Sequence, residues 1–156
     1  MRLYLVQHAA ATSKEEGSTR PLTPQGREDI VRTGGFLSLF ERPKPTHIIH
    51  SDKLRSQQTA QMLAEAWGCQ GIEKNLDLSP RSDPNIWAKR LIEIHEDTLL
   101  VGHLPHLQHL AAILLCQNAK RKVIQFRNGG ITCLEREENN WSLIWQVYPQ
   151  LFYPQD

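Results

Sequence analysis

The sequence has 156 residues, of which 40% are hydrophobic and 22% are charged, a length and composition typical of one domain with a single apolar core. Eighteen Lys and Arg residues nearly balance 17 Asp and Glu residues, which disfavours nucleic acid or an anionic membrane as the default partner. No apolar stretch is long enough to span a bilayer, and the N-terminus lacks the layout of a signal peptide, so we expect a cytoplasmic protein.

The first half of the chain alternates short apolar runs with segments of helical periodicity. Aliphatic and β-branched runs indicate buried strands, whereas apolar residues spaced by three and four indicate helices. Thr23 and Pro24 supply an N-cap and a first helical residue, and Gly68 suits a C-terminal cap. These signals predict, in order, a strand over 2–7, a helix over 23–41, a strand over 46–50 and a helix over 53–67.

The second half continues this alternation and then changes character. Asp83 and Pro84 begin a predicted helix, and Pro105 suits the first turn of the next one. Near the end, a polar turn over 137–140 separates two strand-like runs, which predicts an antiparallel hairpin. The predicted elements are a weak strand over 72–76, a helix over 84–94, a strand over 98–102, a helix over 105–116, and strands over 131–136 and 141–148.

Strands that alternate with helices imply right-handed crossovers and a parallel sheet covered on both faces. We therefore predict an α/β protein, a three-layer α/β/α sandwich with a mostly parallel central sheet and an antiparallel C-terminal hairpin, as a single domain over residues 1–156. In such sheets, ligands bind beyond the carboxyl ends of the strands, where helix N-termini also point. Residues that directly follow strands are therefore the candidate functional residues.

Three side chains suited to phosphate chemistry follow predicted strands. His8 follows the first strand, His103 follows the strand over 98–102, and Arg55 lies within one turn after Ser51 and the second strand. A cation in the first turn of a helix opposes the helix dipole at a cost of about 0.3–1 kcal/mol unless an anion binds there. Guanidinium groups hold phosphate oxygens bidentately, and imidazole is a nucleophile. Taken singly, each of these residues is explained without a ligand, as a helix cap, a solvated side chain or a surface cation. The prediction of a phosphate site therefore depends on all of them lying at the same edge of the sheet.

The motifs around these residues resemble those of the histidine phosphatase superfamily. The family's first-strand signature usually reads Arg-His-Gly, where this chain has Gln7-His8-Ala9. Residues 51–60 resemble its Ser-x-x-x-Arg-x-x-x-Thr-Ala stretch, and residues 101–105 resemble the motif that carries its second histidine. The run from Arg20 to Gly26 and the short length are similar to the SixA-type phosphohistidine phosphatases. The resemblance spans nearly the whole chain and is weakest in 71–96 and beyond 120.

The resemblance implies that His8 attacks phosphorus and becomes transiently phosphorylated, while Arg55 and His103 hold the equatorial oxygens. Water then hydrolyses the phosphoimidazole. The reaction so implied needs no metal and no cofactor. The residues expected to line the phosphate pocket besides these are Gln7, Arg20, Ser51 and Leu104.

The first-strand motif departs from the family pattern at two positions. Gln7 removes one positive charge, and a charged hydrogen bond contributes about 1.5–3 kcal/mol against about 0.5–1.5 kcal/mol for a neutral one. Transition-state stabilisation would then be about ten- to a hundredfold weaker. Arg20 is the candidate replacement, and its alternative role is an ion pair with Glu15, Glu16 or Asp52. Ala9 in place of glycine requires a negative φ.

The choice of substrate depends on the leaving group. The candidate general acids are Asp77, Asp83, Glu15 and Glu16, and none is compelling, because Asp83 is first of all an N-cap. A phosphohistidine substrate needs this help less, since its imidazole leaving group is easily protonated. We expect a phosphohistidine phosphatase whose partner is a phosphorylated phosphotransfer domain or histidine kinase. The alternatives are a phosphatase of small phosphate esters and a phosphate-binding regulatory module with weak turnover.

Neither the histidines nor the cysteines predict a metal site. His103, His106 and His109 follow one another at intervals of three residues, and we do not expect their side chains to converge on one ion. We place His106 and His109 at the exposed rim, with His106 as a candidate substrate contact. The three cysteines contain no C-x-x-C pair, and we interpret them as buried structural thiols: Cys69, Cys116 and Cys133.

Overall fold

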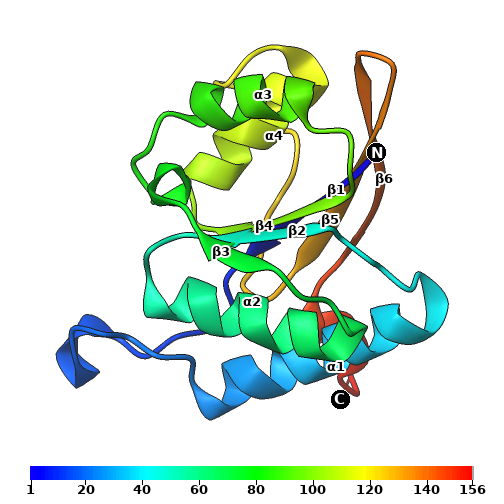
Figure 1. The fold of residues 1–156 in the computed structure, drawn as a ribbon. Coiled ribbons are helices and arrows are strands. Elements are labelled where there is room, and N and C mark those ends of the chain that lie inside the picture. Colours follow the sequence, from blue (N-terminus) through cyan, green and yellow to red (C-terminus); the bar gives the residue numbers. More distant parts are fainter. Residues whose placement is uncertain (156) are drawn as a thin grey trace.

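Six strands form one mixed sheet between two layers of helices in the computed structural model, which describes residues 1–155 (Figure 1). The order across the sheet is β3-β2-β4-β1-β5-β6. The strands are β1 (Arg2–Gln7), β2 (His47–His50), β3 (Ile72–Lys74), β4 (Thr98–Gly102), β5 (Ile131–Glu137) and β6 (Asn140–Val147). The helices are α1 (Pro24–Phe40), α2 (Leu54–Trp67), α3 (Pro84–Glu93) and α4 (His106–Cys116), with short 3₁₀ turns η1 (Lys14–Glu16), η2 (Leu76–Leu78) and η3 (Pro149–Phe152).

The predicted fold class is confirmed. β1 pairs in parallel with β4, and β2 pairs in parallel with both β4 and β3, whereas β5 and β6 form the antiparallel hairpin beside β1. The strand predicted over 72–76 is shorter, because the side chain of Asn75 accepts a hydrogen bond from the Asp77 N–H (2.9 Å) and turns the chain into η2.

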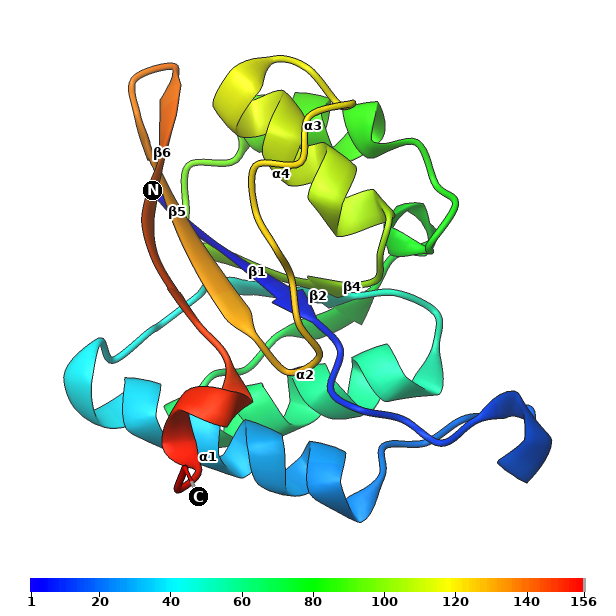
Figure 2. The same ribbon diagram turned by 180° about the vertical axis from the view of Figure 1, so that it is seen from behind.

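The two helical layers cover opposite faces of the sheet (Figures 1 and 2). In β1, Tyr4 and Val6 pack towards α1 and α2, while Leu3 and Leu5 pack towards α3 and α4. All four are at most 2% exposed, so β1 is buried on both faces. Its two ends are therefore held firmly in place.

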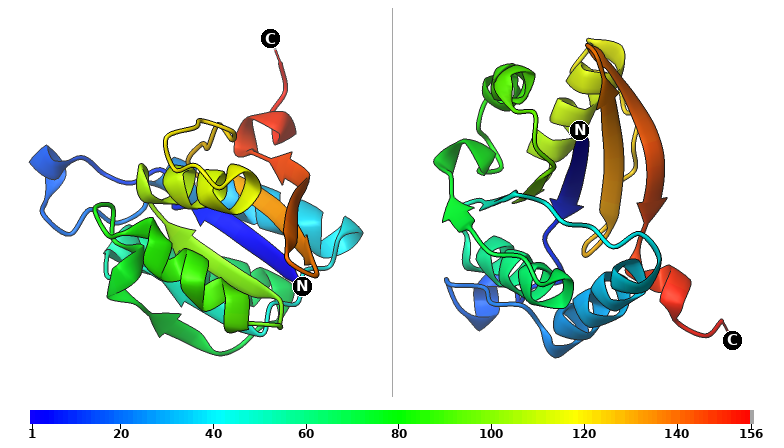
Figure 3. Two further views of the ribbon diagram at one scale, coloured as in Figure 1. Left: turned by 90° about the horizontal axis from the view of Figure 1, so that it is seen from above. Right: turned by 45° about the vertical axis from the view of Figure 1, so that its right-hand side comes forward.

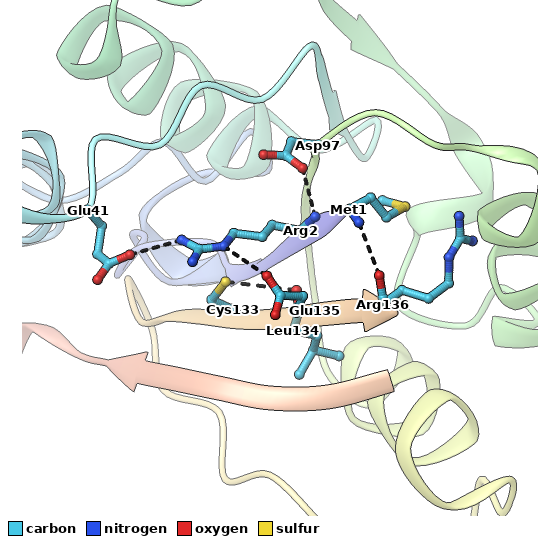
Figure 4. A network of polar contacts seen from close by, with 8 residues as sticks. All are labelled: Met1, Arg2, Glu41, Asp97, Cys133, Leu134, Glu135 and Arg136. Atoms are coloured by element: carbon cyan, nitrogen blue, oxygen red, sulfur yellow. Dashed lines mark hydrogen bonds and ion pairs between the residues drawn. The ribbon is translucent and has the colours of Figure 1, made fainter. Parts of the chain in front are cut away.

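The amino end of β1 is fixed by polar contacts (Figure 4). The Arg2 guanidinium binds Glu41 (3.0 Å), which follows α1, and Glu135 (3.4 Å) of β5. The backbone N–H of Arg2 donates to Asp97 Oδ1 (2.7 Å) just before β4. These contacts set the position of β1 against its neighbours at the end of the sheet opposite His8.

At the carboxyl end of β1, the chain leaves the sheet as an arm over residues 11–22 that projects from the body (Figures 2 and 3). A bridge between Ala11 and Leu22, and a bond from the Thr12 N–H to the Pro21 carbonyl (2.9 Å), hold its two sides together. The Thr23 N–H then donates to the Ala10 carbonyl (2.9 Å), which places the start of α1 beside the chain that follows His8.

The expectations for the cysteines and for His106 are partly wrong. Cys133 is buried, but Cys69 is only half-buried and Cys116 is exposed. His106 is 1% exposed rather than at the rim, because it lies on the same stripe of α4 as Leu107 and Leu110, which face the core. Neither of its ring nitrogens has a partner among residues 1–155, and burial lowers its pKa to about 4. No helix in this range combines the length and the apolar character needed to cross a membrane.

We predict opposite effects for alanine at two glycines of α1. A Cβ at Gly26 would clash with the Ala10 carbonyl, whereas one at Gly35 would meet nothing within 4 Å. Gly26→Ala should therefore lower the free energy of unfolding by about 1–3 kcal/mol through overpacking. Gly35→Ala should raise it by about 0.5–1 kcal/mol through helix propensity. Urea unfolding of both variants measures the difference, and equal changes would contradict the close packing at Gly26.

The buried His106 predicts a loss of stability on acidification. Its pKa is about 4 in the folded protein and about 6.5 in the unfolded chain. Because the unfolded state binds more protons between these values, the contribution of His106 to stability is present above pH 6.5. It is lost as the pH falls towards 4, by up to about 1.4 kcal/mol per pH unit. We expect His106→Leu to flatten the pH dependence of the unfolding free energy, measured by urea unfolding from pH 7 to 4.

The matched control for this measurement is His95→Leu, at an exposed histidine beyond α3. This variant should keep the wild-type slope. An unchanged slope in His106→Leu would show that the ring is not held neutral in the core.

Candidate active site

Parallel pairing of β1 and β4 brings two histidines to one rim of the sheet. Gln7 and Gly102 are the last paired residues of these strands, so His8 and His103 leave the sheet side by side. The His8 N–H donates to the Gly102 carbonyl (3.1 Å), which extends the ladder by one bond. The two imidazole centroids are 4.9 Å apart and the ring planes are inclined by 54°.

Arg55 completes this group from the first turn of α2. Its Nε–H donates to Nε2 of His8 (3.2 Å), while Nδ1 of His8 lies 2.7 Å from the Ala9 carbonyl. Arg55 can only donate and the carbonyl can only accept, so Nδ1 carries the hydrogen and Nε2 carries the lone pair that accepts the Arg55 bond. The atom of His8 that faces the arginine is therefore a nucleophile.

Ser51 orients the second histidine. Its Oγ lies 2.6 Å from Nε2 of His103 and accepts a weaker bond from the Lys53 N–H (3.3 Å). The hydroxyl hydrogen is then free to be donated to His103, which leaves the hydrogen of the neutral ring on Nδ1. Ser51 is fully buried and His103 is 3% exposed, so this bond is shielded from water.

Both imidazoles of the pair are neutral at pH 7. Burial and, to a smaller extent, the charges of Arg55 and Arg20 lower the pKa of His8 to about 4 against the opposing effect of the Ala9 bond. Burial also lowers the pKa of His103 to about 3, together with the nearby His8 ring, should it become protonated, and the charge of Arg55. A neutral His8 keeps its lone pair for attack on an electrophile.

Arg20 reaches towards the pair from the arm. Its Nε donates to the Thr12 carbonyl (2.9 Å), and its residue adopts a left-handed φ of 49°. The alternative ion pairs with Glu15, Glu16 or Asp52 are wrong, since no ion pair within residues 1–155 includes Arg20. Asp52 instead pairs with Lys53 (3.1 Å) and accepts a bond from Ser79 (2.7 Å). The terminal nitrogens of Arg20 thus make no hydrogen bond in the described chain.

Gln7 and Leu104 border the histidines without contacting them through a polar group. The Oε1 of Gln7 is buried and has no partner among the described residues. Leu104 is half-buried and packs against the apolar layer formed by α3 and α4. Ala9 is fully buried with a negative φ, so its methyl group is accommodated, and its N–H donates to Oγ1 of Thr59 (3.1 Å).

Two residues that the sequence reasoning missed support the backbone of His8. The side chain of Asn128 donates to the His8 carbonyl (2.9 Å), and the Gly129 N–H bonds the carbonyl of Gln7 (3.0 Å). Gly129 has φ +72°, and a Cβ there would lie 3.1 Å from Pro149 Cγ. The Asn-Gly-Gly run before β5 is a turn signal that could have pointed to this contact.

The acidic candidates lie in other contacts. Asp77 pairs with Arg90 (2.5 Å), and Asp83 accepts a bond from the Asn85 N–H (2.9 Å) as the N-cap of α3. Glu16 accepts a bond from the Ser13 N–H (2.9 Å) in the arm. No group of three or more His, Cys, Asp or Glu side chains in the described part of the chain could hold a metal ion.

Comparison with known proteins agrees with this geometry. The model of the histidine phosphatase superfamily (branch 1) matches residues 3–82, just over half of the chain. No curated protein sequence matches this chain. Among solved structures, the protein histidine phosphatase SixA complexed with tungstate is similar with a TM-score of 0.85, at 20% identity over 98% of this chain and 100% of that one.

Two further solved structures share the fold at lower identity. The alpha-ribazole phosphatase from Shigella flexneri has a TM-score of 0.74 at 16% identity, over 92% of this chain and 95% of that one. The mycobacterial glucosyl-3-phosphoglycerate phosphatase has a TM-score of 0.70 at 16% identity, over 92% and 96%. Sequence motifs, sheet topology and the family model agree, and the chain belongs to the histidine phosphatase superfamily.

Proposed function

We propose that this protein hydrolyses phosphohistidine on another protein through a phosphorylated His8 intermediate, without a metal ion. The observation that carries the proposal is the state of His8. Its Nδ1–H is bound to the Ala9 carbonyl, its Nε2 lone pair faces Arg55, and its ring is 4.9 Å from that of His103. A neutral nucleophile beside a guanidinium is what phosphoryl transfer requires, since that reaction depends on positioning and charge stabilisation.

The reaction proceeds in two displacements. The Nε2 lone pair of His8 forms a bond to phosphorus while the bond from phosphorus to the substrate imidazole breaks. That imidazole, which has taken a proton from solvent on its other ring nitrogen, accepts the electron pair of the broken bond and leaves as the neutral ring. A water oxygen then attacks phosphorus, the bond to Nε2 breaks, and inorganic phosphate leaves. His8 regains its lone pair and keeps its Nδ1 hydrogen throughout. Arg55 balances the charge of the phosphoryl oxygens, and His103 donates to one of them.

The choice of substrate class is supported by the contacts of the candidate general acids, because Asp77, Asp83 and Glu16 are engaged away from the histidine pair. An alkoxide leaving group needs a general acid, whereas the imidazole of phosphohistidine is basic enough to take its own proton. The similarity in fold to SixA supports the same choice, and the candidate partners are a phosphorylated phosphotransfer domain or a histidine kinase. The alternative substrate is a small phosphate ester, because the proteins of similar fold include an alpha-ribazole phosphatase and a glucosyl-3-phosphoglycerate phosphatase.

A second candidate function is phosphate binding with weak turnover. It is favoured by Gln7, whose neutral side chain stands where the family motif has an arginine and whose Oε1 lacks a partner in the described chain. A buried carbonyl oxygen is also unfavourable beside an anion.

The proposal predicts that His8 carries the phosphoryl group. Wild-type protein incubated with a ³²P-labelled phosphotransfer domain should release inorganic phosphate and show transient label that is stable to base and labile to acid. His8→Ala should lose both signals, by at least a thousandfold in rate, because the nucleophile is gone. The exposed-histidine variant His95→Ala is the control and should match wild type. Equal phosphate release by His8→Ala would end the enzymatic claim.

A second prediction concerns the missing charge. If Gln7 limits turnover, Gln7→Arg should raise kcat by about ten- to a hundredfold, the value of one charged hydrogen bond over a neutral one. If Arg20 already supplies this charge, Gln7→Arg should give little gain and Arg20→Gln should lower kcat by a similar factor. Arg27→Gln, at an exposed arginine of α1, controls for net charge. An unchanged kcat in Arg20→Gln, together with no gain in Gln7→Arg, would refute a role for a second cation.

A further inference from the structure

The connection between α4 and β5 is an extended segment without a strand partner. Residues 122–127 belong to no helix or strand, and their side chains alternate, with Ile124 and Phe126 buried and Gln125 and Arg127 exposed. This alternation is the period of a β-strand with one face on a core. Figure 2 shows the segment running back beside α4 towards the start of β5.

The backbone of this segment is unpaired. Among residues 1–155, no group accepts a hydrogen bond from the N–H of any residue in 122–128, and only the carbonyls of Gln125 and Arg127 accept one. A row of free amide groups in extended chain is a template to which another strand can add. A groove of about 430 Å³ lies along it, bordered by Gln108 of α4 and by residues 122–125.

The charge of the groove selects the partner. No Asp or Glu occurs between Asp97 and Glu135, so α4 and the segment carry no carboxylate. The exposed cations there are Lys120, Arg121, Lys122 and Arg127, and none of them takes part in an ion pair within the described residues. The only aromatic side chain of the segment, Phe126, is buried, and the Tyr148 ring beside the segment is covered by the Arg127 guanidinium at 4.6 Å from its centroid, so neither offers an open face for stacking bases.

The segment also leads to the nucleophile. Asn128, which follows it directly, donates its side-chain N–H to the His8 carbonyl (2.9 Å). A strand laid along 122–127 would span about 20 Å and end near Asn128, which contacts the backbone of His8.

We propose that residues 122–127 are a docking edge, to which an extended acidic segment of the phosphorylated protein adds as a strand in the groove beside α4. The identification of that partner as the phosphoprotein rests on the proposed function. Backbone pairing would supply affinity, and the four cations would supply selectivity for acidic sequence.

The first test measures binding without turnover. The probes are a capped nine-residue peptide of alternating Glu and Val, the same peptide with Lys in place of Glu, and a uridine oligonucleotide. In ¹⁵N-labelled protein, the acidic peptide should shift the amide signals of residues 122–128 most and slow their hydrogen exchange. The Arg121→Glu/Lys122→Glu variant should bind it about tenfold more weakly. Arg42→Glu/Lys44→Glu, which makes the same charge change at exposed residues beyond α1, should bind it like wild type.

Several outcomes would overturn the docking edge. These are shifts centred elsewhere, equal binding of the lysine peptide, equal weakening by the control variant, and tighter binding of the oligonucleotide than of the acidic peptide on the same amides.

The second test links docking to hydrolysis. The Arg121→Glu/Lys122→Glu variant should have a kcat/KM about tenfold lower for a phosphorylated phosphotransfer domain. Its hydrolysis of 4-nitrophenyl phosphate should be unchanged. Equal loss on both substrates would overturn the docking role. Peptide binding at 122–128 without phosphate release from any substrate would support the docking edge and refute the proposed hydrolysis, so the two failures are distinguishable.

Discussion

The site depends on the parallel pairing of β1 with β4. Because parallel neighbours end at the same edge, the register of Gln7 with Gly102 brings His8 and His103 together although 95 positions separate them in sequence. A shift of one residue would exchange the side chains that β1 presents to the two helical layers, and the close packing of both layers opposes it. The packing that stabilises the sheet thereby also fixes the distance between the two imidazoles.

The start of α2 connects this pair to the rest of the rim. Arg55 binds His8, Thr59 binds the Ala9 N–H, and Gln58 accepts a bond from the Leu22 N–H at the base of the arm (2.8 Å). Ser56 donates to the Val101 carbonyl at the end of β4 (2.7 Å). Two turns of one helix thus contact three segments distant in sequence, which gives a physical reason for the Ser-x-x-x-Arg-x-x-x-Thr-Ala pattern as one unit.

The sequence was sufficient where local periodicity and strand ends decide the structure. The rule that ligands gather at the carboxyl ends of parallel strands placed His8, Arg55 and His103 on one rim, and the structure brings them together. Prediction from the sequence failed where a contact depends on the tertiary path of an irregular segment. Asn128 is an example, because it lies 120 residues from His8 in the sequence and no local pattern reveals their contact. His106 was misplaced for another reason, since its polarity suggested the surface although its spacing from Leu107 and Leu110 put it on the buried stripe.

With Gln7 in place of the motif arginine, the candidate second cation of the site is Arg20 on the arm, and no longer a residue of the sheet. Arg55 is fixed by α2, but Arg20 belongs to the projecting arm, which is held at its base by the Ala11–Leu22 bridge and by Gln58. The position of the Arg20 guanidinium therefore depends on the contacts of the arm, which include its own bond to the Thr12 carbonyl (2.9 Å), and not on the pairing of a buried strand. If Arg20 supplies the second charge of the proposed phosphate site, a protein partner that contacts the arm would strengthen that site from outside it.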